Sequence, residues 1–437
     1  MSNFKQALFN KINNKKAKVA VIGLGYVGLP LAAEFAKRGF AILGIDIDKD
    51  KINKLKKGKS YIQDVSHNSI KGILKDKNSL FSCDYKNIHK ADVVIISVPT
   101  PLRKSREPDI SYVVNAAREI KKLFKKGQLI ILESTTYPGT TEEILLPLFS
   151  EKGWKVGKDF FLAFSPERVD PANKNYNTSN ITKIIGGVTK DCTQLAKQIY
   201  GKIISEVVPV SSSKVAEMAK LLENTFRSVN IGLINEIALM CDNLGVNIWE
   251  VIEAAKTKPF GFMPFYPGPG LGGHCLPIDP LYLSWKSRLH GFEPRLIEMA
   301  SQINSFMPKH VVKKIVGLLD NKLKRSIIKA NVLVVGVSYK KNVCDVRESP
   351  AIDIMRLLIR KQAIVHYCDP HVPKINIIEK SLHSARLTKK IVKSSDCVVI
   401  VTDHDKVDYN LILNNAKLIF DTRNVYKRIK NRKVFRI

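Results

Sequence analysis

Short apolar runs and helix-forming segments alternate along the chain, which is the pattern of a doubly wound parallel sheet. In the first half, buried strands are predicted at 18–22, 41–45, 92–98 and 129–135. In the second half, they are predicted at 331–336, 364–368, 396–402 and 417–422. Both series predict an α/β unit of the Rossmann-like kind.

The segment between these two series has a different pattern. Residues 213–244 contain no proline and one interior glycine, Gly232, which predicts a single unusually long helix. A loop rich in Gly and Pro follows at 259–280. We therefore expect two Rossmann-like doubly wound domains, 1–212 and 326–437, joined by a helical middle region, 213–325. Long linking helices commonly carry a dimer interface, so an oligomer is expected.

Composition excludes several classes of protein. With 437 residues, 45% hydrophobic and 25% charged, the chain is too long for one core and otherwise ordinary for a globular protein. It has no apolar run long enough to span a membrane, and its start lacks the apolar core of a secretion signal. We expect a cytoplasmic protein with no membrane partner.

The net charge of +31 raises the alternative of a basic nucleic-acid-binding protein. The lysines are scattered, however, and no arginine-rich stripe is present. A solvated lysine surface is therefore the preferred interpretation, with no nucleic-acid partner.

The seven cysteines show neither CxxC spacing nor paired clusters. This argues against a metal site or a disulfide framework and favours free thiols in a reducing compartment.

A glycine-rich turn points to a dinucleotide cofactor. Gly23, Gly25 and Gly28 follow a predicted strand and open a helix, and Asp46 ends the next strand. The glycines allow close approach of a pyrophosphate, and the carboxylate would bind both ribose hydroxyls and repel a 2′-phosphate. NAD⁺ is therefore favoured over NADP⁺, although Lys49 and Lys51 lie nearby.

The loop 267–280, PGPGLGGHCLPIDP, places Cys275 before a predicted helix, where a thiolate is favoured. The alternative is a buried, inert cysteine. Asp279, followed by Pro280, also fits an ordinary helix N-cap.

Other polar residues are ambiguous by themselves. Lys220 and Asn224 lie four apart on the long helix, on one face, and taken alone they are best interpreted as part of a solvated stripe with Glu217 and Arg227. Glu167 fits an acid at a helix start, and Thr135 fits the end of a strand.

Taken together, ordered motifs across nearly the whole chain resemble the UDP-glucose/GDP-mannose 6-dehydrogenase family. They are GLGYVGLPLA (23–32), VPTP (98–101), ESTTYPGTT (133–141), FSPERV (164–169), AEMAKLLENT (216–225), PGPGLGGHCLPIDP (267–280), YKKNVCDVRESP (339–350) and DTRNV (421–425). The sequence is most similar to the branch acting on UDP-N-acetylhexosamines, and to UDP-N-acetyl-D-glucosamine 6-dehydrogenases in particular. FMPFYPGPGLGGHC (262–275), DPLYLSWKSR (279–288) and SPERVDPAN (165–173) carry that similarity.

This resemblance implies an NAD-dependent, four-electron oxidation of the sugar C6 alcohol to a uronic acid, for surface polysaccharide synthesis. Cys275 would hold the aldehyde as a thiohemiacetal and then a thioester, while Lys220 and Asn224 stabilise the oxyanion. Asp279 would take part in proton transfer, and Glu167 with Thr135 in general-base steps.

It also implies binding residues and no metal. For the cofactor these are Gly23, Gly25, Tyr26, Val27, Gly28, Asp46, Pro99, Thr100, Thr135 and Arg347. For the UDP-sugar they are Glu167, Arg168, Lys220, Asn224, Gly272, Lys340 and Arg423.

Two positions depart from other members. Pro171 stands where hexose enzymes carry a second glutamate, a feature shared with the N-acetylhexosamine branch, and Cys344 replaces a usual acid. His274 has no inferred role. UDP-glucose, UDP-N-acetylmannosamine and UDP-N-acetylgalactosamine stay open as substrates, and a nucleotide-sugar sensor or a nucleic-acid-binding protein stays open as a function without catalysis.

Overall fold

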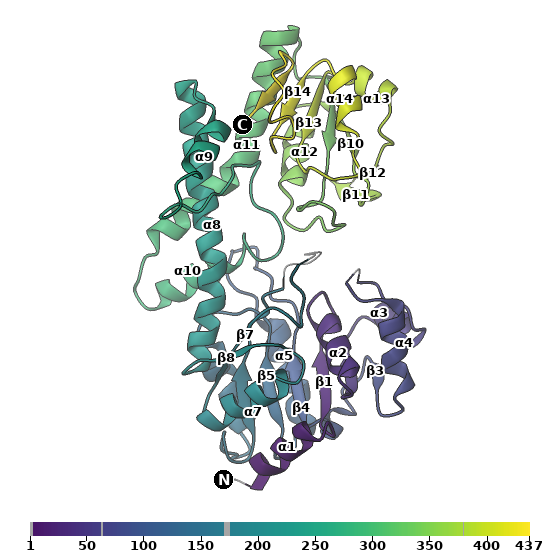
Figure 1. The fold of residues 1–437 in the computed structure, drawn as a ribbon, viewed down its shortest axis with the longest axis vertical. Coiled ribbons are helices and arrows are strands. Elements are labelled where there is room, and N and C mark those ends of the chain that lie inside the picture. Colours follow the sequence, from purple (N-terminus) through teal and green to yellow (C-terminus); the bar gives the residue numbers. More distant parts are fainter. Residues whose placement is uncertain (1–2, 63, 170–174, 379) are drawn as a thin grey trace. The chain divides into compact units, whose positions relative to one another are not determined.

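The computed structural model describes residues 3–62, 64–169, 175–378 and 380–437 (Figure 1). The chain divides into two compact units. The first contains residues 1–223 and 285–290, and the second contains residues 224–284 and 291–437.

The first unit is built on an eight-stranded sheet of order β3-β2-β1-β4-β5-β6-β7-β8. Its strands are β1 (Lys18–Ile22), β2 (Ala41–Ile45), β3 (Leu80–Ser82), β4 (Val93–Ile96), β5 (Leu129–Leu132), β6 (Phe161–Phe164), β7 (Lys183–Gly187) and β8 (Val207–Pro209). The predicted strands are present and pair in parallel. One difference from a fully parallel sheet is that β7 runs antiparallel to β6.

Alternate residues of these strands point to opposite faces, so helices cover both sides of the sheet. One face packs against α1 (Asn3–Asn13), α2 (Gly28–Lys37), α3 (Lys49–Lys56), α4 (His67–Lys75) and α7 (Lys190–Tyr200). The other packs against η1 (Ile88–Lys90), α5 (Ser111–Leu123), η2 (Thr141–Leu145), α6 (Leu146–Ser150) and the start of α8 (Ser213–Leu244). This is the doubly wound arrangement that the sequence predicts.

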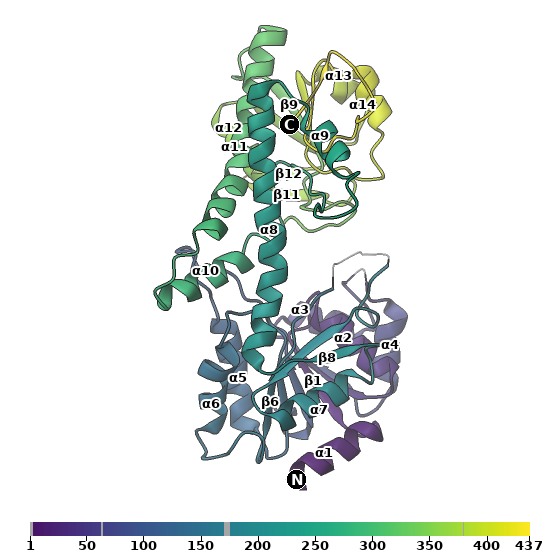
Figure 2. The same ribbon diagram turned by 60° about the vertical axis from the view of Figure 1, so that its left-hand side comes forward.

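The long helix α8 has the predicted bounds, Ser213–Leu244, and 32 residues. In the second unit it lies beside α11 (Arg295–Leu323), as Figure 2 shows. A Cβ atom at Gly232 would lie 2.9 Å from the Cβ of Ala300. The single interior glycine of the helix is thus the place where α11 approaches closely.

The second unit contains a five-stranded parallel sheet of order β10-β9-β13-β14-β15 and a hairpin, β11-β12. Its strands are β9 (Asn331–Val335), β10 (Ile364–Cys368), β11 (Lys374–Ile377), β12 (Lys380–His383), β13 (Cys397–Ile400), β14 (Ile419–Asp421) and β15 (Val434–Arg436). Its further helices are α9 (Ile248–Ala255), α12 (Pro350–Arg360), α13 (Lys389–Ser394) and α14 (Tyr409–Asn415), and it also contains the first residues of α10 (Asp279–Leu289). Ser349 caps α12 through its hydroxyl, which accepts the Ala351 N–H.

Among the described residues, no helix is long and apolar enough to cross a membrane. The same residues hold no cluster of His, Cys, Asp and Glu that could bind a metal ion. All seven cysteines lie in the described part of the chain, and none of them forms a disulfide.

Candidate active site

The glycine-rich turn of the first unit leads from β1 into α2. Gly23 has a φ of +89°, a left-handed conformation that glycine adopts without strain. A Cβ atom at Gly28 would lie only 1.9 Å from the carbonyl oxygen of Gly23. The turn therefore needs glycine at both positions, and its backbone leaves space where a side chain would otherwise stand.

Asp46 follows β2 and is buried beside this turn. Its Oδ2 accepts the Leu24 N–H at 2.9 Å, and its Oδ1 accepts the Asp48 N–H at 3.0 Å. The Lys51 Nζ lies 3.4 Å from Oδ2. The Tyr61 hydroxyl donates to the Leu24 carbonyl at 2.6 Å, a contact that the sequence did not predict.

Other predicted cofactor residues follow neighbouring strands. Pro99 and Thr100 come after β4, Thr135 after β5, and Tyr26 and Val27 lie in the turn after β1. Because β1, β4 and β5 are parallel neighbours, these residues follow the carboxyl ends of strands at one edge of the sheet. This edge is the usual ligand side of a doubly wound sheet.

Glu167, after β6, is held by three donors. Its Oε1 accepts the N–H groups of Arg168 and Val169 at 2.9 and 2.7 Å, and its Oε2 accepts from the Lys183 Nζ at 3.0 Å. Burial would raise the pKa of Glu167, but the Lys183 charge and the Val169 N–H outweigh burial and lower that pKa. Sequence reasoning missed Lys183, whose only signal is its position at the start of an apolar strand.

Arg168, predicted to bind substrate, is held by neighbours of its own unit. Its guanidinium pairs with Glu223 at 2.8 Å and donates to the Thr182 carbonyl at 2.7 Å. Pro171, the position at which this sequence departs from hexose enzymes, lies outside the described residues.

The α8 residues singled out from the sequence are not part of a solvated stripe. Lys220 and Asn224 are 8% and 7% exposed, and Glu217 is fully buried. Arg227, the remaining member of that alternative, is exposed. The solvated interpretation is therefore wrong for three of its four residues, because these positions lie on the packed side of the helix.

Glu217 anchors α8 to the turn that follows β5. Its carboxyl accepts the Gly139 N–H at 2.5 Å, the Thr141 N–H at 2.9 Å and the Thr141 hydroxyl at 2.7 Å. Burial nevertheless raises the pKa of Glu217 to about 7, against these hydrogen bonds.

In the second unit, Cys275 is exposed, so the alternative of a buried, inert cysteine is wrong. Its carbonyl accepts the N–H groups of Ile278 and Asp279 at 3.1 and 2.8 Å, which places the thiol one turn before the body of α10. Asp279 is 2% exposed, and its carboxylate accepts a hydrogen bond from the Asn224 amide at 2.5 Å. The structure thus brings two of the predicted residues, Asn224 and Asp279, into contact.

The glycine loop before Cys275 packs on residues of the same unit. A Cβ atom at Gly272 would lie 2.7 Å from the Cβ of Tyr339, and one at Gly268 would lie 2.9 Å from the Arg423 guanidinium. The Gly273 N–H donates to the Arg347 carbonyl at 3.0 Å. Two predicted ligand-binding arginines therefore lie beside this loop.

Buried amides also fix this loop. Asn235 on α8 accepts the Gly268 N–H at 3.0 Å and donates to Asn304 on α11 at 2.9 Å. Asn304 in turn donates to the Ser228 carbonyl at 3.0 Å. Sequence reasoning did not identify these asparagines, since their partners come from distant segments.

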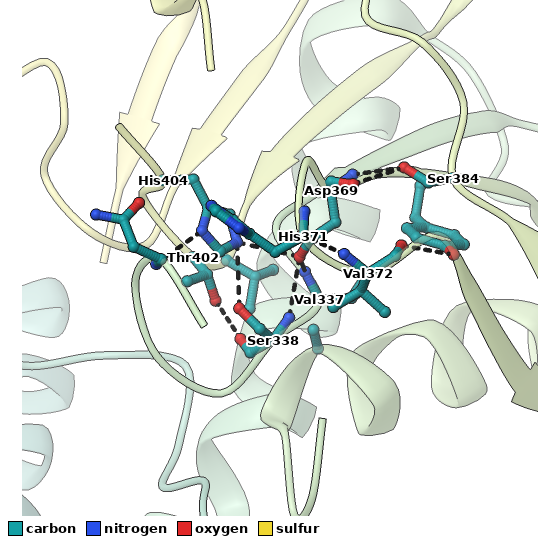
Figure 3. Close-up of polar contacts among 12 residues, drawn as sticks. Val337, Ser338, Asp369, His371, Val372, Ser384, Thr402 and His404 are labelled. Atoms are coloured by element: carbon teal, nitrogen blue, oxygen red, sulfur yellow. Dashed lines mark hydrogen bonds and ion pairs between the residues drawn. The ribbon is translucent and has the colours of Figure 1, made fainter. Parts of the chain in front are cut away.

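Lys340 belongs to a loop that is held by polar contacts of the buried Ser338 and His404, both of which are labelled in Figure 3. The Ser338 hydroxyl donates to the Lys340 carbonyl at 2.8 Å. His404, fully buried, accepts the Asn342 N–H at Nδ1, so its proton is on Nε2, which lies 3.0 Å from the Asp369 carboxylate. The His404–Asp369 pair therefore fixes the backbone on both sides of Lys340.

Asp369 is surrounded by donors from its own unit (Figure 3). It accepts the backbone N–H groups of Val337, Ser338, His371 and Val372 at 2.7 to 3.1 Å. Burial would raise its pKa, but the hydrogen bonds from His404 and the backbone lower it. The carboxylate is stabilised in its charged form.

Two residues without an inferred role are placed as follows. His274 is half-buried, and burial, together with the Arg347 charge, lowers its pKa. Cys344 is exposed. Neither arrangement indicates a role.

Taken together, these features define a dinucleotide-dependent enzyme with an exposed thiol. Comparison with known proteins agrees with this class. Three models of the UDP-glucose/GDP-mannose dehydrogenase family match: the NAD binding domain over residues 17–204, the central domain over 214–306 and the UDP binding domain over 333–428.

Relatives over nearly the whole chain carry related names. UDP-N-acetyl-D-glucosamine 6-dehydrogenase of Pseudomonas aeruginosa is 38% identical, over 86% of this chain and 86% of its own. UDP-N-acetyl-D-mannosamine dehydrogenase of Methanococcus vannielii is 37% identical, over 94% of this chain and 93% of its own. The solved structure of the UDP-D-ManNAc dehydrogenase of Pyrococcus horikoshii has a TM-score of 0.87 and 34% identity, covering 96% of this chain and 99% of its own.

The chain belongs to the UDP-glucose/GDP-mannose dehydrogenase family. It is an NAD-dependent UDP-sugar dehydrogenase, and the family resemblance inferred from its motifs is confirmed.

Proposed function

We propose that this enzyme oxidises the C6 alcohol of a UDP-N-acetylhexosamine to the carboxylate, with UDP-N-acetyl-D-glucosamine as the first candidate. The observation that carries this proposal is the exposed Cys275 thiol, one turn before α10, whose first residue Asp279 is paired with Asn224. An alcohol-to-acid oxidation needs a group that retains the aldehyde, and an exposed thiol on an ordered turn is suited to this task.

The overall reaction consumes one CH₂OH group, two NAD⁺ and one water, and gives a carboxylate, two NADH and three protons. After the first oxidation, the Cys275 thiolate adds to the C6 aldehyde and forms a thiohemiacetal. The second oxidation converts this adduct to a thioester. Water then attacks the thioester carbonyl, the C–S bond breaks and Cys275 is released as the thiolate.

Lys220 and Asn224 are proposed to stabilise the negative oxygen at C6 in these steps. Both are buried polar groups on α8, where donors are worth more than in water. The contact between Asp279 and the Asn224 amide supports a fixed orientation of that amide. Asp279 is the proposed partner for proton transfer near the thiol.

Glu167 is the proposed general base, with Thr135 positioning water. The lowered pKa of Glu167 supports an ionised carboxylate that can accept a proton at neutral pH. Thr135 is half-buried at the end of β5, which is compatible with this role.

The glycine turn fits NAD. The Gly28 position has no room for a Cβ atom, and Asp46 accepts only two backbone N–H groups, which leaves lone pairs for ribose hydroxyls. When bound, each NAD⁺ supplies the acceptor for one of the two hydrides that the reaction releases. Pro99, Thr100, Thr135, Tyr26, Val27 and Arg347 are the further proposed contacts.

Lys340, Arg423 and Arg168 are proposed to hold the UDP-sugar, since their charges suit a diphosphate. Gly272 is proposed to allow close approach of the sugar to the thiol loop. Arg423 donates to the Val401 carbonyl at 2.7 Å and so presents an ordered guanidinium.

UDP-N-acetyl-D-mannosamine is the second candidate substrate. Relatives with that name are 35–37% identical over 93% or more of the chain, which is comparable with the 38% of the Pseudomonas aeruginosa enzyme. Chain similarity therefore does not favour one epimer strongly. A product uronate would serve surface polysaccharide synthesis in the cytoplasm.

The test is NADH formation at 340 nm with UDP-N-acetyl-D-glucosamine beside UDP-N-acetyl-D-mannosamine, UDP-N-acetylgalactosamine and UDP-glucose. Fast turnover of the first alone supports the proposal. If another sugar reacts faster, the proposed substrate is wrong and the proposed type of reaction still holds. Absence of NADH with every sugar would favour a nucleotide-sugar sensor.

We also propose a homodimer formed through α8. The helix exposes large apolar side chains at spacings of three, four and seven residues along one face, namely Val215, Met218, Leu222, Phe226, Leu233, Met240 and Leu244. Such a stripe is self-complementary in a two-fold dimer. Light scattering should give a molar mass of twice the chain mass of 49.1 kDa, and Leu233→Glu should reduce the measured mass to that of a single chain.

A further inference from the structure

Glu167 is one end of a buried chain of ionisable groups in the first unit. Lys183, at the start of β7, is 2% exposed, and its Nζ lies 3.0 Å from Glu167 and 2.5 Å from Glu133. Glu133, after β5, is fully buried. Its Oε1 also accepts the Tyr200 hydroxyl at 2.7 Å. Two carboxyls thus share one ammonium in the interior.

Such an arrangement is costly unless it has a purpose or complete pairing, because buried charges lose their hydration. The pairing is incomplete, since Glu133 Oε2 has no hydrogen-bond partner among the described residues. A hydrophobic residue at position 183 would stabilise an ordinary strand equally well. The lysine is therefore better explained by what it does to Glu167.

The geometry points to Lys183 as a positioning residue for Glu167: anchored by Glu133, it fixes one carboxylate oxygen and keeps that carboxyl ionised for proton transfer. This inference rests on the proposed role of Glu167 as general base. Because Lys183 occupies Oε2 from the buried side and two backbone N–H groups occupy Oε1, the carboxylate cannot rotate freely.

The remaining charges around Glu167 act in known directions. Lys220 on α8 also lowers the pKa of Glu167, and Glu133 is the second carboxyl paired with Lys183. Arg168 is paired with Glu223. Burial raises the pKa of Glu133 itself, and the Lys183 charge only partly opposes this. Lys183, with its Nζ 3.0 Å from Oε2, is a direct ion-pair partner of Glu167.

The test compares two substitutions in the full-length protein. Lys183→Met removes the cation with little change of shape, and should move the Glu167 titration up by at least one pH unit. Glu133→Gln removes the competing anion, and should move it down. A merely structural role would disturb the site in the same direction in both variants, so opposite shifts identify the positioning role.

Two readouts separate this inference from the proposed function. The acidic limb of the kcat/KM profile for NADH formation should move with the Glu167 titration, and kcat/KM below that limb should fall about tenfold per unit of upward shift. Carboxyl-¹³C-glutamate NMR, assigned with Glu167→Gln, reports the same titration without turnover. If the protein oxidises no nucleotide-sugar but the Glu167 titration still moves in opposite directions in Lys183→Met and Glu133→Gln, the proposed reaction is refuted and the Lys183 inference stands.

Lys5→Met is the matched control. Lys5 is also buried and paired with a carboxylate, Asp191, at 2.6 Å, so its loss should lower stability and leave the Glu167 titration unchanged. Should Lys183→Met fail to fold, the double variant Lys183→Met/Glu133→Gln keeps the charge balance and should give a smaller upward shift. The inference is overturned if Glu167 titrates at the wild-type pH in Lys183→Met or in the double variant. It is also overturned if both single variants move the Glu167 titration in the same direction.

Discussion

Each of the two sheet-containing halves of the chain places an aspartate carboxyl in the same local setting, but the two carboxyls differ in their hydrogen-bond partners. In each, a glycine with positive φ follows the first strand: Gly23 at +89° and Gly336 at +80°. In each, an aspartate follows the adjacent strand, Asp46 after β2 and Asp369 after β10, and accepts an N–H from the loop after that glycine.

The difference lies in the number of donors. Asp46 accepts two backbone N–H groups and faces Lys51, whereas Asp369 accepts four backbone N–H groups and faces His404. The first loop continues with Gly25 and Gly28, which leave its backbone open to a ligand. The second continues with Ser338 and Lys341, and protein groups fill the space. The same strand–turn–aspartate geometry therefore leaves Asp46 with fewer protein donors than Asp369, which supports the proposed cofactor contact of Asp46.

The largest expected effect comes from Asp369→Ala. It leaves several buried donors without an acceptor, so the free energy of unfolding should fall by about 4 kcal/mol at neutral pH. Because the folded pKa of Asp369 is lowered, its stabilising contribution is present above its ordinary pKa and is lost as pH falls through the lowered value. Chemical denaturation measures both effects.

Affinity for NAD⁺ should be unchanged in any folded Asp369→Ala protein. Asp353→Ala, which removes a carboxylate from an exposed pair with Arg356, is the control and should cost little. A loss of NAD⁺ affinity without loss of stability would mean that the second carboxyl also binds cofactor.

Glu217 offers a third carboxyl with backbone donors and the opposite pH dependence. Its folded pKa is raised from 4.5 to about 7, so the folded state binds a proton that the unfolded state has lost. The free energy of unfolding should therefore fall by roughly 2 to 3 kcal/mol as pH rises through that window. Glu217→Gln should not show this component, and the difference between the two denaturation series from pH 4 to 8 measures it.

Asp46→Ala should act on the cofactor rather than on the fold. We expect about a tenfold to thirtyfold weaker NAD⁺ affinity, because the ribose hydroxyls lose their acceptor. Selectivity against NADP⁺ should also decrease, since Lys51 would then be available to a 2′-phosphate. Titration of both cofactors, with exposed Asp50→Ala as control, tests this. If Asp46→Ala binds NAD⁺ as tightly as the wild type, Asp46 does not differ from Asp369 in cofactor binding.

His404→Gln should give the smallest change. Losing the acceptor for the Asn342 N–H loosens the loop that carries Lys340, so KM for the nucleotide-sugar should rise about threefold while kcat stays the same. The exposed His366→Gln is the matched control. A lower kcat with an unchanged KM would show that the loop does not act through substrate binding.

Much of the fold could be predicted from sequence because its signals are local. Buried parallel strands are nearly continuous apolar runs, and the bounds of 18–22, 41–45, 364–368 and helix 213–244 agree with the structure. The antiparallel β7 could not be predicted, since strand direction depends on pairing with the distant β6. The N-terminal helix α1 was not predicted either.

Candidate site residues could be named from the sequence where they belong to a motif, and not where packing alone brings them together. Cys275, Asn224 and Asp279 were found through their motifs, and the last two are in contact. Lys183 could not be found, because a lysine in a strand normally indicates an exposed edge, and only pairing of β7 with β6 buries it beside Glu167.

The most direct test of the account is the number of NADH formed per nucleotide-sugar consumed, measured with limiting UDP-N-acetyl-D-glucosamine for the wild type and for Cys275→Ala. The account predicts two NADH and one uronate for the wild type, and no steady formation of uronate by Cys275→Ala although it still binds NAD⁺. One NADH per sugar, or full uronate formation by Cys275→Ala, would contradict the thiol mechanism.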